Sequence, residues 1–107
     1  VPRVAHGFTT ELMAARLLGA RLCGVEAIGQ SERSARIRLD GYADKATGKE
    51  RTNLMLSIRR TDSVRNILIE RYGIAPSRIE AQGIGSNAQP YEDNDLNRVV
   101  IVTALPE

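Results

Sequence analysis

The sequence predicts an α/β (α+β) domain, a two-layer sandwich in which two helices cover one face of a mixed sheet, in the order β-α-β-α-β-β. Three observations predict this class: one segment that alternates apolar and polar residues, two apolar stripes with helical spacing, and a β-branched run near the C-terminus. A chain of 107 residues has the size of one domain. We therefore expect residues 1–107 to share a single core.

The N-terminal part of the chain favours a short strand followed by a helix. Residues 1–6 offer the strand. From Phe8 to Val25 apolar residues recur at three- and four-residue steps, which is the spacing of one helical face. Gly19 and Gly24 each weaken such a helix by up to ~1 kcal/mol. We therefore expect the helix to end before Gly29.

The middle of the chain predicts a strand, a loop and a second helix. Residues 34–43 alternate in polarity, as half-buried strands do. Residues 44–52 show no apolar period, so we expect a loop. The helix that follows should end at Tyr72, because Gly73 suits the C′ position and Pro76 comes soon after. Its apolar stripe comprises Leu56, Val64, Ile67 and Leu68.

Two strands are expected in the C-terminal part. Residues 77–81 predict a short strand, and the Gly-, Asn- and Asp-rich residues 82–95 predict a loop. Residues 97–104 predict the last strand. Its continuous run from Val99 to Val102 favours a central place in the sheet.

Composition argues against several classes of function. A net charge of +2, with three tyrosines and one phenylalanine, is unlike a dedicated nucleic-acid binder. One cysteine and one histidine cannot form the usual zinc shell. No apolar run reaches the ~18–20 residues that cross a bilayer. We expect no metal, no cofactor and no enzymatic activity, since no pair of carboxylates is arranged for acid-base chemistry.

The most informative residue is Arg60, which lies on the flank of the apolar stripe of the second helix. A partly buried guanidinium needs matched partners, preferably a carboxylate. Asp44 is the best candidate, because it ends the preceding strand and opens the loop into this helix. The two residues either form an internal salt bridge, as in a protein-protein interaction module, or bind the two charges of a zwitterion. An RNA-binding sheet carrying several arginines is a less favoured alternative.

Between Ile37 and Ala104, about two-thirds of the chain, a series of short motifs follows in a fixed order. In order and spacing this series resembles the OmpA-like C-terminal peptidoglycan-binding domain of the OmpA/Pal/MotB type. The series consists of Gly41-Tyr42-Ala43-Asp44, Gly48, Asn53, Leu56-Ser57, Arg59-Arg60, Val64, Gly73-Ile74, Arg78-Ile79, Gly83-Ile84-Gly85 and Asn97-Arg98.

The resemblance implies non-covalent binding of peptidoglycan through the diaminopimelate of the stem peptide. Such binding would tether the outer membrane, or an envelope complex, to the cell wall on the periplasmic side. Asp44 matches the family residue that contacts the ligand's ammonium, and Arg60 matches the one that contacts its carboxylate. The other ligand-binding candidates that the resemblance implies are Asn53, Leu56, Arg98 and Ala43.

Two of these candidates have particular features. Asn53 falls at the expected start of the second helix, where it would either touch ligand or act as an N-cap. Ala43 stands where many family members carry threonine or serine, so one hydroxyl contact would be missing.

We expect the chain to be the C-terminal part of a larger envelope protein, with any membrane attachment supplied by other segments.

Overall fold

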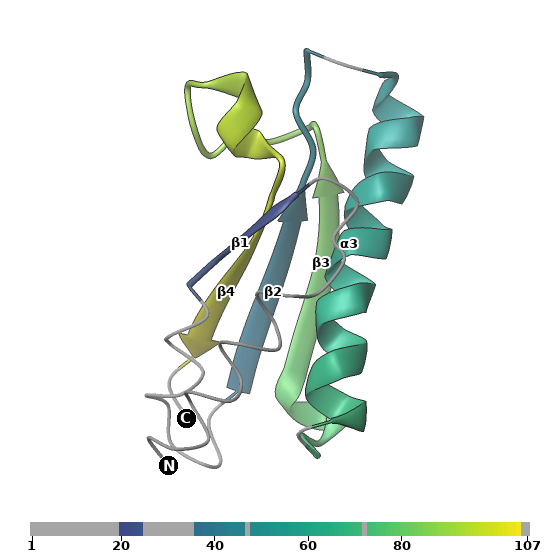
Figure 1. The fold of residues 1–107 in the computed structure, drawn as a ribbon, viewed down its shortest axis with the longest axis vertical. Helices are drawn as coiled ribbons and strands as arrows, with labels where there is room; N and C mark the ends of the chain where they lie inside the picture. Colours follow the sequence, from purple (N-terminus) through teal and green to yellow (C-terminus); the bar gives the residue numbers. More distant parts are fainter. Residues whose placement is uncertain (1–19, 25–35, 47, 72, 106–107) are drawn as a thin grey trace.

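One long helix lies along a four-stranded sheet in the computed structural model of this chain (Figure 1). The structure describes residues 20–24, 36–46, 48–71 and 73–105. These residues contain a single α-helix, and together with the mixed sheet it confirms the α+β class. The elements are β1 (Arg21–Cys23), β2 (Arg36–Tyr42), α3 (Glu50–Glu70), β3 (Ile79–Gly85) and β4 (Val99–Leu105), with 3-10 turns at Pro76–Arg78 and Asn94–Asn97.

The strands are arranged in the order β1-β4-β2-β3. β2 and β3 are parallel and are joined through α3, which gives a β-α-β unit. β4 runs antiparallel to β2 and parallel to β1. The β-branched strand therefore lies inside the sheet, as its sequence predicts.

Strand β2 shows the expected alternation. Ile37, Leu39 and Gly41 are buried, and Arg36 and Arg38 are exposed. Asp40 is more buried than its outward position predicts, and it accepts a 3.0 Å ion-pair contact from Arg38 Nε. The apolar face of β2 joins the core cluster, which comprises Ile37, Leu39, Val64, Leu68, Ile74, Ile79, Val100 and Val102.

The buried face of α3 changes character along the helix. Its C-terminal half buries Val64 and Leu68 in the core. Its N-terminal half instead buries polar side chains, namely Asn53, Ser57, Arg60 and Thr61. Polar groups are buried only where they find partners. The first half of α3 is therefore the part of the fold that is built for polar contacts.

Glycines in β3 let α3 approach the sheet closely. A Cβ at Gly83 would lie 2.8 Å from the Ile58 backbone nitrogen, and one at Gly85 would lie 2.9 Å from Leu54 Cα. The helix ends at Glu70, two residues before the predicted Tyr72. Gly73 nevertheless adopts the expected left-handed conformation, with φ +66°, and Ile74 N donates to Leu68 O at 3.0 Å. This spacing and this ending fix where the side chains of α3 stand relative to the strand ends.

Several element boundaries differ from the sequence prediction. The helix expected from Phe8 to Val25 is wrong at residues 21–23, which form β1 and pair with β4. The rest of that helix, and the strand expected at residues 1–6, lie outside the described residues. α3 begins at Glu50, so the preceding loop is shorter than predicted. β3 continues to Gly85, because its ladder with β2 extends to that residue.

Candidate functional site

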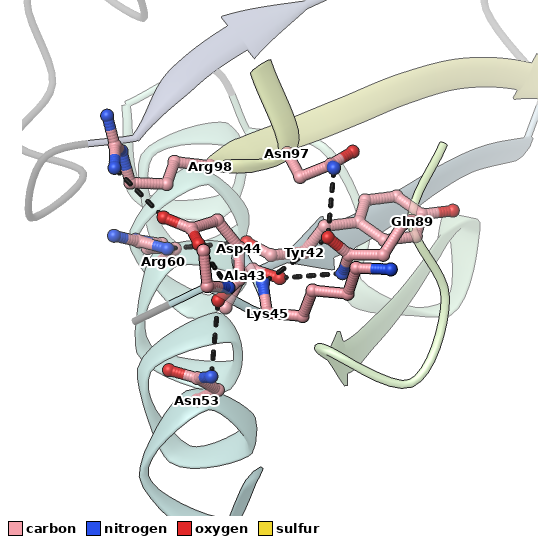
Figure 2. A network of polar contacts seen from close by, with 10 residues as sticks. Tyr42, Ala43, Asp44, Lys45, Asn53, Arg60, Gln89, Asn97 and Arg98 are labelled. Atoms are coloured by element: carbon pink, nitrogen blue, oxygen red, sulfur yellow. Dashed lines mark hydrogen bonds and ion pairs between the residues drawn. The ribbon is translucent and has the colours of Figure 1, made fainter. Parts of the chain in front are cut away.

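Asp44 lies just after the end of β2, in a loop held from several directions (Figure 2). Ala43 N donates to Gly85 O at 2.9 Å, which ties the end of β2 to the end of β3. The Asp44 side chain is only 1% exposed. Its Oδ1 accepts a hydrogen bond from Ala46 N at 2.7 Å, the pattern of an Asx turn. The carboxylate is thus fixed by its own loop.

Arg98 supplies the ion pair of this carboxylate. Arg98 stands immediately before β4, and one of its terminal nitrogens lies 2.9 Å from Asp44 Oδ2. The Arg98 side chain is 37% exposed, whereas that of Asp44 is almost fully buried. Solvent therefore reaches the site from the Arg98 side.

Arg60 brings a second guanidinium from α3 to the same place. The residue is 2% exposed, and a terminal nitrogen donates to Tyr42 O at 3.3 Å. Burial lowers the pKa of Arg60, the charge of Arg98 lowers it further, and Asp44 acts in the opposite direction. Arginine nevertheless stays charged in proteins. Asp44, Arg60 and Arg98 thus form a charged cluster drawn from three separate segments.

The two arginines and one carboxylate leave this cluster with an excess of one positive charge. From the sequence, Asp44 is expected to pair with Arg60, and Arg98 has no part in that expected pairing. In the structure, the carboxylate has an ion pair with Arg98. The mutual repulsion of two buried or half-buried guanidiniums favours an added carboxylate. The cluster is suited to bind an anionic group that stands beside a cationic one.

The remaining predicted residues frame the cluster. Asn53 is buried in the first turns of α3, and its Nδ2 donates to Asp44 O at 3.3 Å. It is not the N-cap, which is Lys49. Leu56 is half-buried one turn before Arg60, and Ala43 is buried beside Asp44. Asn53 and Ala43 therefore act on the loop backbone, and Leu56 flanks the arginine.

Gly48 permits the contact between Asn53 and the loop. Its φ is +74°, and a Cβ there would lie 2.9 Å from Asn53 Oδ1. Both the backbone angle and the space select glycine at this position. Gly48, expected in a turn from the sequence, therefore also leaves room for the side chain of Asn53.

Gln89 is a residue of the site that sequence reasoning missed. It lies in the segment between β3 and β4, and its side-chain amide contacts both the Asp44 loop and Asn97 (Figure 2). Asn97 is 0% exposed. The sequence around Gln89 offers one local signal of an ordered backbone, which is the proline at position 90. A residue before proline has restricted backbone freedom.

Comparison with known proteins finds similarity to the OmpA family and to outer membrane proteins. The OmpA family model matches residues 24–100. Outer membrane protein 40 of Porphyromonas gingivalis is 44% identical over 71 residues, which are 66% of this chain and 18% of that protein. Outer membrane protein Omp38 of Acinetobacter baumannii is 34% identical over 76 residues, covering 65% of this chain and 21% of its own length. The chain thus spans about a fifth of the length of these relatives.

Solved structures share the fold. The C-terminal domain of Helicobacter pylori MotB aligns with a TM-score of 0.62 and 21% identity, over 77% of this chain and 66% of that one. The OmpA-like domain of FopA1 from Francisella tularensis aligns with a TM-score of 0.54 and 19% identity, over 76% and 59%. At these identities the likeness concerns the architecture alone.

Proposed function

The chain belongs to the OmpA family, and we propose that it binds peptidoglycan non-covalently through the diaminopimelate of the stem peptide. The observation that carries the proposal is the cluster of Asp44, Arg60 and Arg98, in which two guanidiniums share one carboxylate. OmpA-like domains are binding modules and not enzymes, and the proposed function involves no chemical step.

The free end of diaminopimelate carries an ammonium and a carboxylate on one carbon. In the proposed complex the ligand carboxylate lies against the Arg60 guanidinium, which offers fixed donors in a fork. The ligand ammonium lies against the Asp44 carboxylate. Asn53 and Ala43 hold the loop that carries this aspartate. Leu56 provides an apolar flank for the methylene chain of the ligand.

Arg98 has a distinct role in this proposal. In the structure it occupies Asp44 Oδ2, where the ligand ammonium would bind. Its side chain is more than a third exposed, so it is able to turn away. The ligand ammonium then replaces one cation beside Asp44, and Arg98 joins Arg60 at the ligand carboxylate. The number of ion pairs at the site is preserved or increased.

This arrangement would select diaminopimelate over lysine. A lysine side chain also ends in an ammonium but brings no second carboxylate. With lysine the two guanidiniums lose their partner, which costs about 1–3 kcal/mol, or roughly 5- to 150-fold in affinity. Because a single stem peptide offers few contacts, we expect weak binding at one site and firm attachment only through many sites on the polymer.

Co-sedimentation with purified sacculi tests the proposal. The wild type should pellet with diaminopimelate-type sacculi, and Asp44→Asn and Arg60→Lys should lose at least about tenfold in affinity. Asp44→Asn keeps an acceptor for Ala46 N and removes only the charge. Arg60→Lys keeps the charge and removes the fork. Both variants should melt cooperatively.

Matched controls stand on the same helix. Arg59→Lys repeats the arginine change at the neighbouring exposed residue, and Asp62→Asn repeats the carboxylate change at another exposed position. Both controls should bind as the wild type does. Equal pelleting of all five proteins would refute the proposed site, and no pelleting of the wild type would refute the function.

The site in the cell would be the periplasmic side of the outer membrane, where the wall is within reach. The matched relatives are outer membrane proteins. In this setting the domain, as the C-terminal part of a larger envelope protein, would tether the outer membrane or an envelope complex to the cell wall. None of the helices in the described segments is long and apolar enough to span a bilayer.

A further inference from the structure

The side-chain amide of Gln89, in the loop between β3 and β4, forms hydrogen bonds to the backbone on either side of Asp44, to its own loop and to Asn97. Its Oε1 accepts from Lys45 N at 3.3 Å and from Asn97 Nδ2 at 2.9 Å. Its Nε2 donates to Ala43 O at 3.0 Å, Ser86 O at 3.2 Å and Ala88 O at 3.0 Å. One amide thus holds the backbone on both sides of Asp44.

These contacts close a ring around the charged cluster. Gln89 is bound to Asn97, which is followed directly by Arg98, and Arg98 pairs with Asp44. Asn97 is itself fixed, since its Oδ1 accepts from Tyr91 N and its Nδ2 donates to Tyr91 O, both at 2.9 Å. The ring therefore joins the two segments that carry the ion pair (Figure 2).

The chemistry of the contacts requires a neutral amide. The oxygen of Gln89 faces two N–H donors, and the nitrogen faces three carbonyl oxygens that share its two hydrogens. A carboxylate at this position would place a negative oxygen against those carbonyls. An apolar side chain of the same length would leave the donors and acceptors without this partner.

We propose that Gln89 is a positioning residue for ligand binding, which sets the distance between Asp44 and Arg98 without touching the ligand. The inference rests on the proposed function, because it assigns Asp44 to the ligand ammonium. Loss of the Gln89 amide would loosen the loop at residues 43–45 and shift the Asp44 carboxylate. Ligands that need this carboxylate should then bind more weakly, and ligands that need only the arginines should not.

The test compares two soluble probes by NMR titration. meso-Diaminopimelate carries both charges, whereas pimelate has the same carbon chain and carboxylates but no ammonium. For Gln89→Glu and Gln89→Met, the dissociation constant for diaminopimelate should rise about tenfold or more. That for pimelate should stay within about twofold for the neutral Gln89→Met. Asn87→Asp is the control for Gln89→Glu, as it adds the same charge at an exposed position of the same loop.

A second readout needs no ligand. The Ala46 amide is protected by Asp44 Oδ1, so its hydrogen exchange reports the position of the carboxylate. Exchange at Ala46 should accelerate in both Gln89 variants, while the Gly85 amide, bound to Ser57 Oγ, stays protected. This comparison separates local loosening of the loop from unfolding.

The outcomes are distinguishable. Diaminopimelate affinity within twofold of wild type in both Gln89 variants would overturn the inference and leave the proposed function intact. An equal loss for both probes in Gln89→Met would overturn it too, since that result indicates a general structural role. Absence of any diaminopimelate binding by the wild type would overturn the proposed function. In that case, Ala46 hydrogen exchange that is the same in the Gln89 variants and the wild type would also overturn the positioning role of Gln89.

Discussion

Gly83→Ala should destabilise the protein by pushing α3 away from β3. A Cβ at this position would overlap Ile58 Cγ1 and would lie 2.8 Å from Ile58 N and 2.9 Å from Ile58 Cα. An ordinary contact begins near 3.4 Å, so the Ile58 backbone must retreat by about 0.5 Å or more. A rotation of the Ile58 side chain would relieve only the first of the three contacts.

The expected size of the effect follows from this forced shift. Overpacking that moves backbone costs about 1–3 kcal/mol of unfolding free energy. In a domain of this size, this corresponds to a fall in Tm of about 4–20 °C. Thermal denaturation followed by circular dichroism measures it. Because Ile58 lies two residues before Arg60 on α3, ligand affinity should fall together with stability.

Two variants make this reasoning refutable. Gln82→Ala introduces the same residue at the exposed neighbouring position and should change Tm little. The double variant Gly83→Ala with Ile58→Ala removes the side-chain contact but keeps both backbone contacts, so stability should not recover fully. A Tm of Gly83→Ala equal to that of the wild type, or full recovery in the double variant, would contradict the backbone argument.

Two further predictions concern the same region. Ser57→Ala should cost about 1–3 kcal/mol of unfolding free energy, because it leaves the buried Gly85 N–H without its 2.9 Å acceptor. Ser63→Ala, which removes a similar hydroxyl from a more exposed turn of α3, should cost far less unfolding free energy. Urea titration of both variants measures the difference. Burial, and next the carboxylate of Asp40, raise the pKa of Tyr42 above its ordinary value of 10.0. The folded protein therefore holds this phenol proton more tightly than the unfolded chain, and unfolding free energy should fall as pH rises above 10.0. Tyr42→Phe should remove that part of the alkaline loss, and an identical pH profile in both proteins would contradict the assignment.

Sequence patterns predicted the elements whose signals are local. The alternation of β2, the apolar stripe of α3 with its glycine ending, and the β-branched run of β4 each report burial on one face or both. The wrong assignment at residues 21–23 has a different cause. Those residues are a strand because they lie beside β4, where Arg21 N donates to Arg98 O at 2.9 Å. Strand formation of this kind depends on a partner far along the chain.

The same distinction applies to the site. Arg60 could be found because a charged residue in an apolar stripe is anomalous, and Asp44 because it stands where strand and helix converge. The family resemblance added Arg98 and Asn53. Gln89 had no such signal, because its role arises from contacts with Lys45 and Ala43, which lie 44 and 46 positions earlier in the chain. Side-chain bonds to a distant backbone follow no period and are therefore invisible to pattern analysis.

The interior position of β4 determines when the site comes into existence during folding. β2, α3 and β3 are consecutive and are able to associate as soon as they are synthesised, whereas the last strand must insert between β1 and β2. Arg98 stands at the entrance to that strand. A chain that has not yet placed its final segment has one guanidinium near Asp44 instead of two. The complete charged cluster, with Arg98 paired to Asp44, therefore exists only after the last strand has joined the sheet.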